Sequence, residues 1–157
     1  MKLIQIRGEF EKCLGKALPD FHRFSARVTK LSETDLPCVN LFFHRDCLVK
    51  NQNIHEDREA RFEIEICFKA TGDAEEELSL VRKRIEDSIE SSDSLQNMIT
   101  DWSQIEVDYA HDMVGNSRIA ALAMTYSVEY IRPLLLPPPP MPGPPKEVWA
   151  NGEKIVG

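Results

Sequence analysis

The sequence lacks the features that define several classes of protein. No apolar run approaches the ~20 residues that are needed to cross a bilayer, so we expect no membrane contact. No pattern of the G-x-S-x-G or H-E-x-x-H type occurs, and no motif joins a histidine to a nucleophile and an acid. We therefore expect no enzymatic activity, no catalytic residue and no cofactor.

Positive charge is also scarce. The 157 residues include 19 Lys and Arg against 26 Asp and Glu, which gives a formal net charge of −7. Nonspecific binding to nucleic-acid phosphates depends on clustered Lys and Arg, so this acidic balance argues against it. This charge balance does not exclude that DNA passes close to the protein.

The four cysteines show no C-x-x-C spacing, and no secretory signal precedes them; they are Cys13, Cys38, Cys47 and Cys67. We therefore expect free thiols in a protein that is made in a reducing cytosol.

Four residues of zinc-ligand type fall within 18 positions, namely Cys38, His44, Cys47 and His55. If this segment is a strand, Cys38 and His44 are separated by ~20 Å, at ~3.3 Å per residue. That distance is too large for one ion, so ordinary thiols are favoured over a zinc site and we expect no metal.

The clearest regular pattern runs from Arg118 to Ile131. Every second side chain is large and apolar, and the positions between them are mostly small or polar; the apolar set is Ala120, Leu122, Met124, Tyr126, Val128 and Tyr130. This period of two predicts a long central strand of an antiparallel sheet. The same alternation over 60–69 predicts a second strand, which should pair as a hairpin with the segment that follows Pro37.

Two amphipathic helices complete the predicted fold. The first spans Lys2 to Leu18, and the second follows Asp73, which is spaced from Glu76 as in a capping box. Asp93 is expected to cap a further turn. Shorter strands are predicted within 21–31 and from Trp102 onward. The order of elements indicates an α+β fold, an antiparallel β-sheet with two helices packed on one face.

Residues 1–132 are predicted to form this domain, and 133–157 an extended arm. Eight of the ten prolines lie between Pro133 and Pro145, which favours a stiff spacer of ~28 Å over 137–145, at ~3.1 Å per residue. The spacer leads to Trp149 and Ile155, apolar residues with no core of their own. The arm is either a hook that docks on a neighbour or a disordered tail, and Pro142-x-x-Pro145 also resembles a ligand of proline-reading domains.

The order of these features resembles the tail terminators of long-tailed bacteriophages. The resemblance rests on the first helix I-R-G-E-F-E-K-C-L-G-K-A-L, the strands L-P-C-V-N-L-F-F and R-F-E-I-E-I-C-F, the helix A-E-E-E-L-S-L-V-R-K-R-I-E-D-S-I, and the closing strands I-E-V-D-Y and A-L-A-M-T-Y-S-V-E-Y. It covers residues 1–134 and does not include the proline-rich arm.

The resemblance implies a structural virion protein of the tail or neck, made in the host cytoplasm. Its subunits would form a ring, typically a hexamer, that caps the tail tube, ends tail polymerisation and docks the head-closure proteins. DNA would pass through the channel without specific binding.

Two predicted loops, 51–58 and 111–116, are natural contact points with the rings above and below. Together with the arm, they give the hypothetical partner contacts Asn51, Asn53, His55, Arg58, His111, Asn116, Trp149 and Ile155. Two alternatives stay open. The chain could be another neck component, such as a head-closure or tail-completion protein, or a cytosolic adaptor that recruits a partner through its proline-rich arm.

Overall fold

A computed structural model describes residues 2–25, 33–114, 117–134, 148–150 and 153–155. Along the chain these residues form α1 (Lys2–Ala17), β1 (His22–Ser25), the 3-10 turn η1 (Glu33–Asp35), β2 (Cys38–Asn51), β3 (His55–Lys69), α2 (Ala74–Glu90), α3 (Asp93–Gln96), β4 (Asp101–Val114), β5 (Ser117–Pro133), β6 (Val148–Ala150) and β7 (Glu153–Ile155).

The main sheet has five strands in the order β1-β2-β3-β5-β4. Strands β2 to β5 pair antiparallel, and β1 adds to β2 in parallel, which makes the sheet mixed. The predicted α+β class and the central position of the 118–131 strand are confirmed, because β5 lies between β3 and β4.

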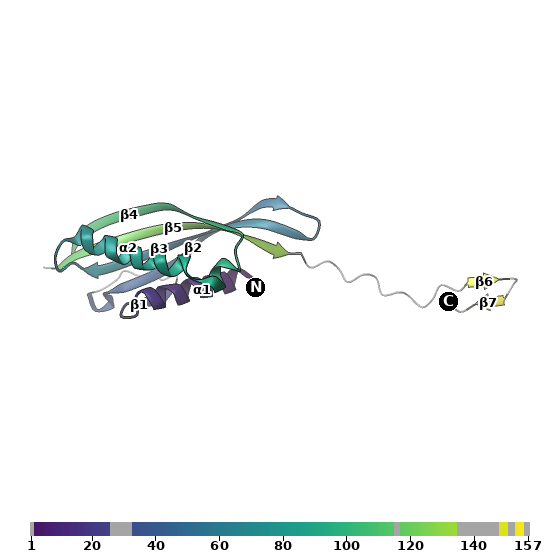
Figure 1. The fold of residues 1–157 in the computed structure, drawn as a ribbon, viewed down its shortest axis with the longest axis horizontal. Coiled ribbons are helices and arrows are strands. Elements are labelled where there is room, and N and C mark those ends of the chain that lie inside the picture. The colour runs from purple at the N-terminus through teal and green to yellow at the C-terminus, as the bar shows by residue number, and fades with distance from the viewer. Residues whose placement is uncertain (1, 26–32, 115–116, 135–147, 151–152, 156–157) are drawn as a thin grey trace.

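Helices α1 and α2 cover one face of this sheet (Figure 1). The core forms between them and the strands, and the predicted apolar faces of β3 and β5 are all buried; on β3 these residues are Ala60, Phe62, Ile64, Ile66 and Phe68. From the helices, Phe10 stacks on Phe62 with ring centroids 5.1 Å apart. The α2 seam of Leu78, Val81, Ile85 and Ile89 is buried as predicted.

Asp73 is the N-cap of α2 as predicted, but the glutamate that accepts from the preceding turn is Glu77, which binds Thr71, and not the predicted Glu76. The Asp73 carboxylate accepts from the backbone N–H of Glu75 at 3.0 Å and of Glu76 at 3.3 Å, which satisfies two of the free donors of the first turn. The expected cap at Asp93 is wrong, because the Ser92 hydroxyl is the N-cap of α3 and accepts from the N–H of Leu95 at 3.3 Å. Asp93 is the first helical residue.

Both hairpins are longer than predicted, and the two predicted loops are largely strand. β2 continues to Asn51 and β3 begins at His55, so the turn between them covers only 52–54. His111 lies inside β4, paired with Ala120. The predicted strand within 21–31 is described only from His22 to Ser25, and its further positions lie outside the described residues.

In the arm, β6 and β7 pair with each other in a separate two-stranded sheet, in which Trp149 is opposite Lys154 and Ile155 opposite Val148. The proline-rich spacer lies outside the described residues.

Candidate assembly surfaces

The two hairpin ends lie at opposite ends of β5. His55, next to the β2–β3 turn, pairs with Pro133 at the end of β5, whereas Val114, before the β4–β5 turn, pairs with Ser117 at its start. Strand β5 has 17 residues. At ~3.3 Å per residue, the hairpin ends are therefore about 50 Å apart.

The β2–β3 end, residues 46–58, extends past the helices (Figure 1). Its large side chains are exposed without a covering helix, and Leu48, Val49 and Ile54 have exposed fractions of 51%, 54% and 63%. Of the predicted contact residues here, Asn51 ends β2 and is exposed, and Asn53 is exposed in the turn.

The other two predicted contacts at this end are partly buried. His55 Nε2 is 3.5 Å from Asp57 Oδ1, so that ring is partly occupied by its own strand. Arg58 is fixed by an ion-pair network and is not a free surface side chain. Asn51, Asn53 and His55 lie together around one turn. Arg58 does not join them, because its side chain is held in ion pairs with Asp46 and Glu56.

The network around Arg58 replaces the apolar core where the sheet extends past the helices. Arg58 donates to Asp46 at 3.0 Å and to Glu56 at 2.8 Å, and Arg132 on β5 donates to Glu56 at 3.3 Å. The Arg58 guanidinium holds the pKa of Glu56 below its usual range. Burial, then the Asp46 carboxylate, raises the pKa of the neighbouring Tyr130 to about 12. These contacts connect three strands beyond the helix layer.

The β4–β5 end carries a different set of side chains. His111 is exposed, as are Tyr109 and Met113, whose exposed fractions are 43% and 59%. Asn116, the last predicted contact of the body, lies outside the described residues. The Tyr109 hydroxyl accepts from Arg82 of α2 at 2.8 Å, and Arg82 also donates to Gln104 at 2.8 Å. Arg82 thereby connects α2 to the outer strand.

The sheet face opposite the helices is acidic. By the strand register, its centre carries Ala121, Ala123, Thr125 and Ser127 of β5. Around them acidic residues outnumber basic ones; the acids are Asp57, Glu59, Glu63, Glu65, Asp101, Glu106, Asp108, Asp112 and Glu129, and the bases Arg45, Lys50, Arg61 and Lys69. Burial, then the charge of Glu63, raises the pKa of Glu65. This face therefore keeps a carboxylate whose ionised form is disfavoured by its surroundings.

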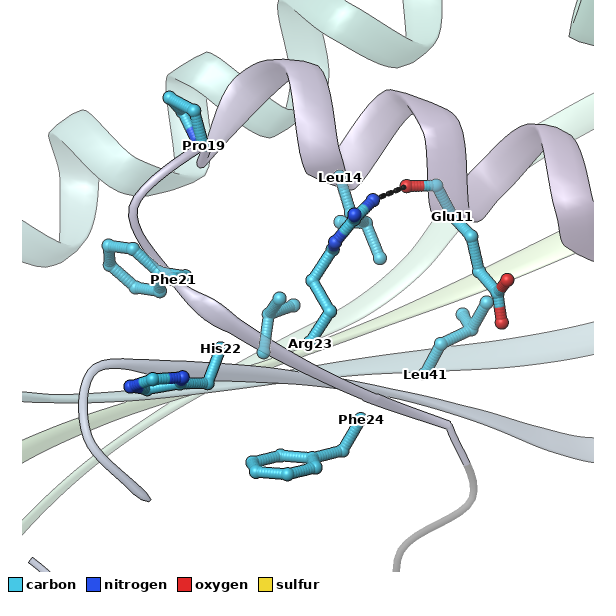
Figure 2. A pocket seen from close by; sticks show the side chains of 9 residues that line it. Glu11, Leu14, Pro19, Phe21, His22, Arg23, Phe24 and Leu41 are labelled. Atoms are coloured by element: carbon cyan, nitrogen blue, oxygen red, sulfur yellow. Dashed lines mark hydrogen bonds between the residues drawn. The ribbon is translucent and has the colours of Figure 1, made fainter. Parts of the chain in front are cut away.

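A cavity of about 550 Å³ lies at the other edge of the sheet, between α1 and β1. In Figure 2, Arg23 points toward α1, whereas His22 and Phe24 point to the other side of β1. The Arg23 guanidinium donates to the backbone oxygen of Glu11 at 3.4 Å. Because Arg23 occupies the core-facing position, this edge of the sheet carries a positive charge, whereas the edge at β4 carries acidic side chains.

The four residues considered as zinc ligands are spread along β2 and β3. Cys38 is opposite Cys67, His44 contacts Glu63 at 2.9 Å, and Arg45 donates to Cys47 at 2.9 Å. His55 lies at the turn. Among the described residues, no group of three or more His, Cys, Asp or Glu side chains could hold a metal ion. No described helix is long and apolar enough to cross a membrane.

Comparison with known proteins identifies the family. Residues 1–130 match the family described as phage minor tail protein U. The chain belongs to this family. The predicted resemblance to a phage tail protein is therefore confirmed, and membership of the minor tail protein U family supports a structural role in the virion rather than an enzymatic one.

Other comparisons are more distant. No curated protein matches the sequence. Among solved structures, a chain titled virion of native gene transfer agent (GTA) particle is similar with 7% sequence identity and a TM-score of 0.43, over 82% of this chain and 92% of that chain.

Sequence patterns missed the network around Asp46 and the Arg82 contacts. These side chains meet from elements that are far apart in the sequence, as between Tyr130 and Asp46, 84 positions apart. One signal was available: Glu56, Arg58 and Arg132 continue the core-facing alternation of β3 and β5 with charged residues of both signs.

Proposed function

We propose that this minor tail protein forms a closed ring, a hexamer, that caps the tail tube, ends its polymerisation and docks the head-closure proteins. The single observation that carries the proposal is the placement of two different hairpin ends about 50 Å apart on one strand, at ~3.3 Å per residue. A cap between two assemblies needs two separate surfaces, and a protomer with this shape supplies one at each end.

The sides of the protomer also differ, as a closed ring requires. In a ring, each subunit contacts its neighbours through two unlike surfaces. Strand β4 forms one edge, with Ile105 45% exposed and acidic side chains beside it. The other edge is formed by β1, where His22 and Arg23 are exposed. We place the lateral contacts at these two edges, which are complementary in charge.

We place the acidic, helix-free sheet face toward the channel. A surface of carboxylates repels DNA phosphates and so permits passage without binding. The outer surface of α2 is the other acidic candidate. In the arm, Trp149 and Ile155 belong to the β6–β7 hairpin, which is too small to be stable alone. We therefore place this hairpin on a neighbouring subunit.

Electron microscopy of the purified chain, alone and mixed with tail tubes, tests the ring. Rings of six subunits and tubes capped at one end are expected. A monodisperse monomer that ignores the tubes would contradict the proposal. Rings that bind only head-closure components would instead identify another neck protein.

Substitutions at the hairpin ends test which surface meets which partner. Asn53→Ala with Ile54→Ser changes the β2–β3 end, and His111→Ala with Met113→Ser the β4–β5 end. Each pair should leave ring formation intact and abolish either tube capping or head joining. If both variants cap tubes and join heads normally, the assignment of the ends is wrong.

Ring formation itself is tested at the β4 edge. Ile105→Asp should abolish rings, because it replaces the exposed apolar side chain of this edge with a carboxylate that would lose its water at the subunit contact. Leu80→Asp is the matched control, since Leu80 is similarly exposed, at 57%, but lies on α2. Equal loss of rings in both variants would show that the charge acts through folding or solubility.

The channel surface is tested by charge reversal in assembled rings. Glu63→Lys with Glu129→Lys, on the inner strands β3 and β5, should make rings retain short DNA at low salt, because those carboxylates would face the channel. Glu75→Lys with Glu90→Lys on α2 is the control. Retention by the α2 variant alone would reverse the proposed orientation.

A further inference from the structure

Two of the free cysteines face each other across neighbouring strands. Cys38 on β2 and Cys67 on β3 are register partners in the antiparallel ladder. Opposite residues in such a ladder have Cα atoms ~4.5 or ~5.5 Å apart, and both distances fall within the range that disulfides adopt. Register partners point to the same face of the sheet, so the two thiols lie side by side. The strands therefore hold the two cysteines at a separation that a disulfide can span.

The two thiols have unequal surroundings. Cys38 is 1% exposed, whereas Cys67 is partly exposed on the helix-free face. The residues beside Cys67 on that face are small, since the register continues through Ala121 of β5 to Ala110 of β4. The neighbouring Cys38 thiol lowers the pKa of Cys67, and the neighbouring Cys67 thiol together with burial raises the pKa of Cys38. Cys67 is thus the accessible and more acidic thiol of the pair.

We propose that Cys38 and Cys67 form an oxidation site, at which a small-molecule disulfide converts the thiol pair into a cross-strand disulfide bond. The Cys67 thiolate attacks the oxidant, forms a mixed disulfide and releases one small thiolate. The Cys38 sulfur then attacks the Cys67 sulfur and displaces the second small thiol, which leaves with the Cys38 proton. Two protein thiols are oxidised, and one small disulfide is reduced to two thiols.

The other cysteines do not compete for this reaction. Cys47 lies nine positions along β2 from Cys38, about 30 Å away at ~3.3 Å per residue, and is held by Arg45. Cys13 is buried in α1 with its carbonyl accepting from Ser88 at 2.9 Å. The geometry therefore predicts one specific bond rather than a mixture.

The bond would close a loop of 30 residues, from 38 to 67, that contains all of β2 and β3 except the last two residues of β3. A constraint of this size on the unfolded chain raises the melting temperature, by ~5–10 °C for a domain of this length. One consequence rests on the proposed function: a virion protein would assemble reduced in the host cytoplasm and become cross-linked after release.

The experiment uses the purified full chain, treated with oxidised glutathione and then denatured and alkylated. Two of four thiols should resist alkylation, a peptide map should join Cys38 to Cys67, and the melting temperature should rise. Alkylation of all four thiols, or glutathione that stays attached to Cys67, would overturn the proposal.

Variants give a second readout. Cys47→Ser should still form the bond, whereas Cys38→Ser should stop at the mixed disulfide on Cys67. Bond formation in the wild type decides the question even if Cys38→Ser fails to fold. Because the thiol count is made on the isolated chain, its outcome is independent of whether rings form.

Discussion

The hydroxyl of Tyr130 on β5 lies 3.0 Å from both carboxylate oxygens of Asp46 on β2, and donates across the intervening strand β3. Tyr130 is 2% exposed, so this contact lies where the buried core meets the ion-pair network around Arg58. It connects the central strand to the hairpin end that we assign to partner binding.

Tyr130→Phe should lower the free energy of unfolding by about 1 kcal/mol, because it removes a hydrogen bond to a charged acceptor that is only partly solvated. Chemical denaturation measures this change. Tyr109→Phe is the matched control, and its effect should be under ~0.5 kcal/mol because the Tyr109 hydroxyl is exposed. Equal losses in the two variants would show that the Asp46 contact adds no particular stability.

The two glycines of α1 should respond differently to alanine. A Cβ at Gly8 meets nothing within 4 Å, whereas a Cβ at Gly15 would collide with the Arg23 guanidinium. Gly8→Ala should therefore stabilise the fold by ~0.5–1 kcal/mol through helix propensity. Gly15→Ala should gain less, because Arg23 must move away from Glu11. Removing Arg23 as well should restore the full gain, and a gain at Gly15 that is independent of Arg23 would contradict this account.

The caps of α2 and α3 predict an order of stability effects. Asp73→Ala should cost ~1 kcal/mol, because it leaves the N–H groups of Glu75 and Glu76 without their acceptor. Asp93→Ala should cost only ~0.3 kcal/mol, since Asp93 acts through the helix dipole and the cap is Ser92. Thermal unfolding of both variants measures the difference, and a larger loss for Asp93→Ala would reverse the assignment of the α3 cap.

Glu65 should give a pH-dependent effect on stability. Its pKa in the folded chain is raised above 4.5, so the fold favours the protonated form. That contribution is full below pH 4.5 and is lost as the pH rises through the raised value. Glu65→Gln should therefore stabilise the monomer at pH 7 by under ~1 kcal/mol, and the difference should vanish on acidification below pH 4.5.

The control for this effect is Glu106→Gln, because Glu106 is exposed on the same sheet face and its replacement should give no gain at pH 7. Denaturation curves at pH 4 and pH 7 distinguish the two variants. A gain for Glu65→Gln that persists unchanged at pH 4 would show that the charge is not its cause.

Removal of the arm should separate assembly from folding. A chain that ends at Leu134 keeps all five strands of the main sheet, so its melting temperature as a monomer should be unchanged. Its rings should be less stable, because the β6–β7 hairpin would no longer contact a neighbour. Light scattering over a dilution series measures this, and identical ring stability in the two chains would exclude the arm from the interface.

Periodicity predicted the elements that have one buried face, and failed where burial changes along a strand. In β3 the apolar residues from Ala60 to Phe68 face the helices, so the alternation was visible. Glu56 and Arg58 occupy the same face farther along, but they are charged because no helix covers them there. From the sequence alone this polar continuation predicts a loop, so the predicted strands of both hairpins stop short of the true turns.

Pairings between distant segments could not be predicted for a different reason. The parallel addition of β1 to β2 and the register of Cys38 with Cys67 depend on tertiary contacts that leave no periodic signal. Ser92 and Asp93 are adjacent and both are favourable cap residues, so the sequence does not decide which of them caps α3. The sequence thus predicts which segments form the candidate contact surfaces, but it does not predict the individual side-chain contacts within them.

The central position of β5 also governs when the fold can form during synthesis. Strand β3 is complete at Lys69, but its partner is translated only over 117–133, which is 48 to 64 residues later. At ~5–20 residues per second, β3 waits roughly 2–13 s on the ribosome with its apolar face and one ladder edge unpaired. The nascent chain must therefore stay soluble through that interval without β5. Substitutions that make β2 or β3 more apolar should reduce the yield of soluble protein even where the stability of the folded protein is unchanged.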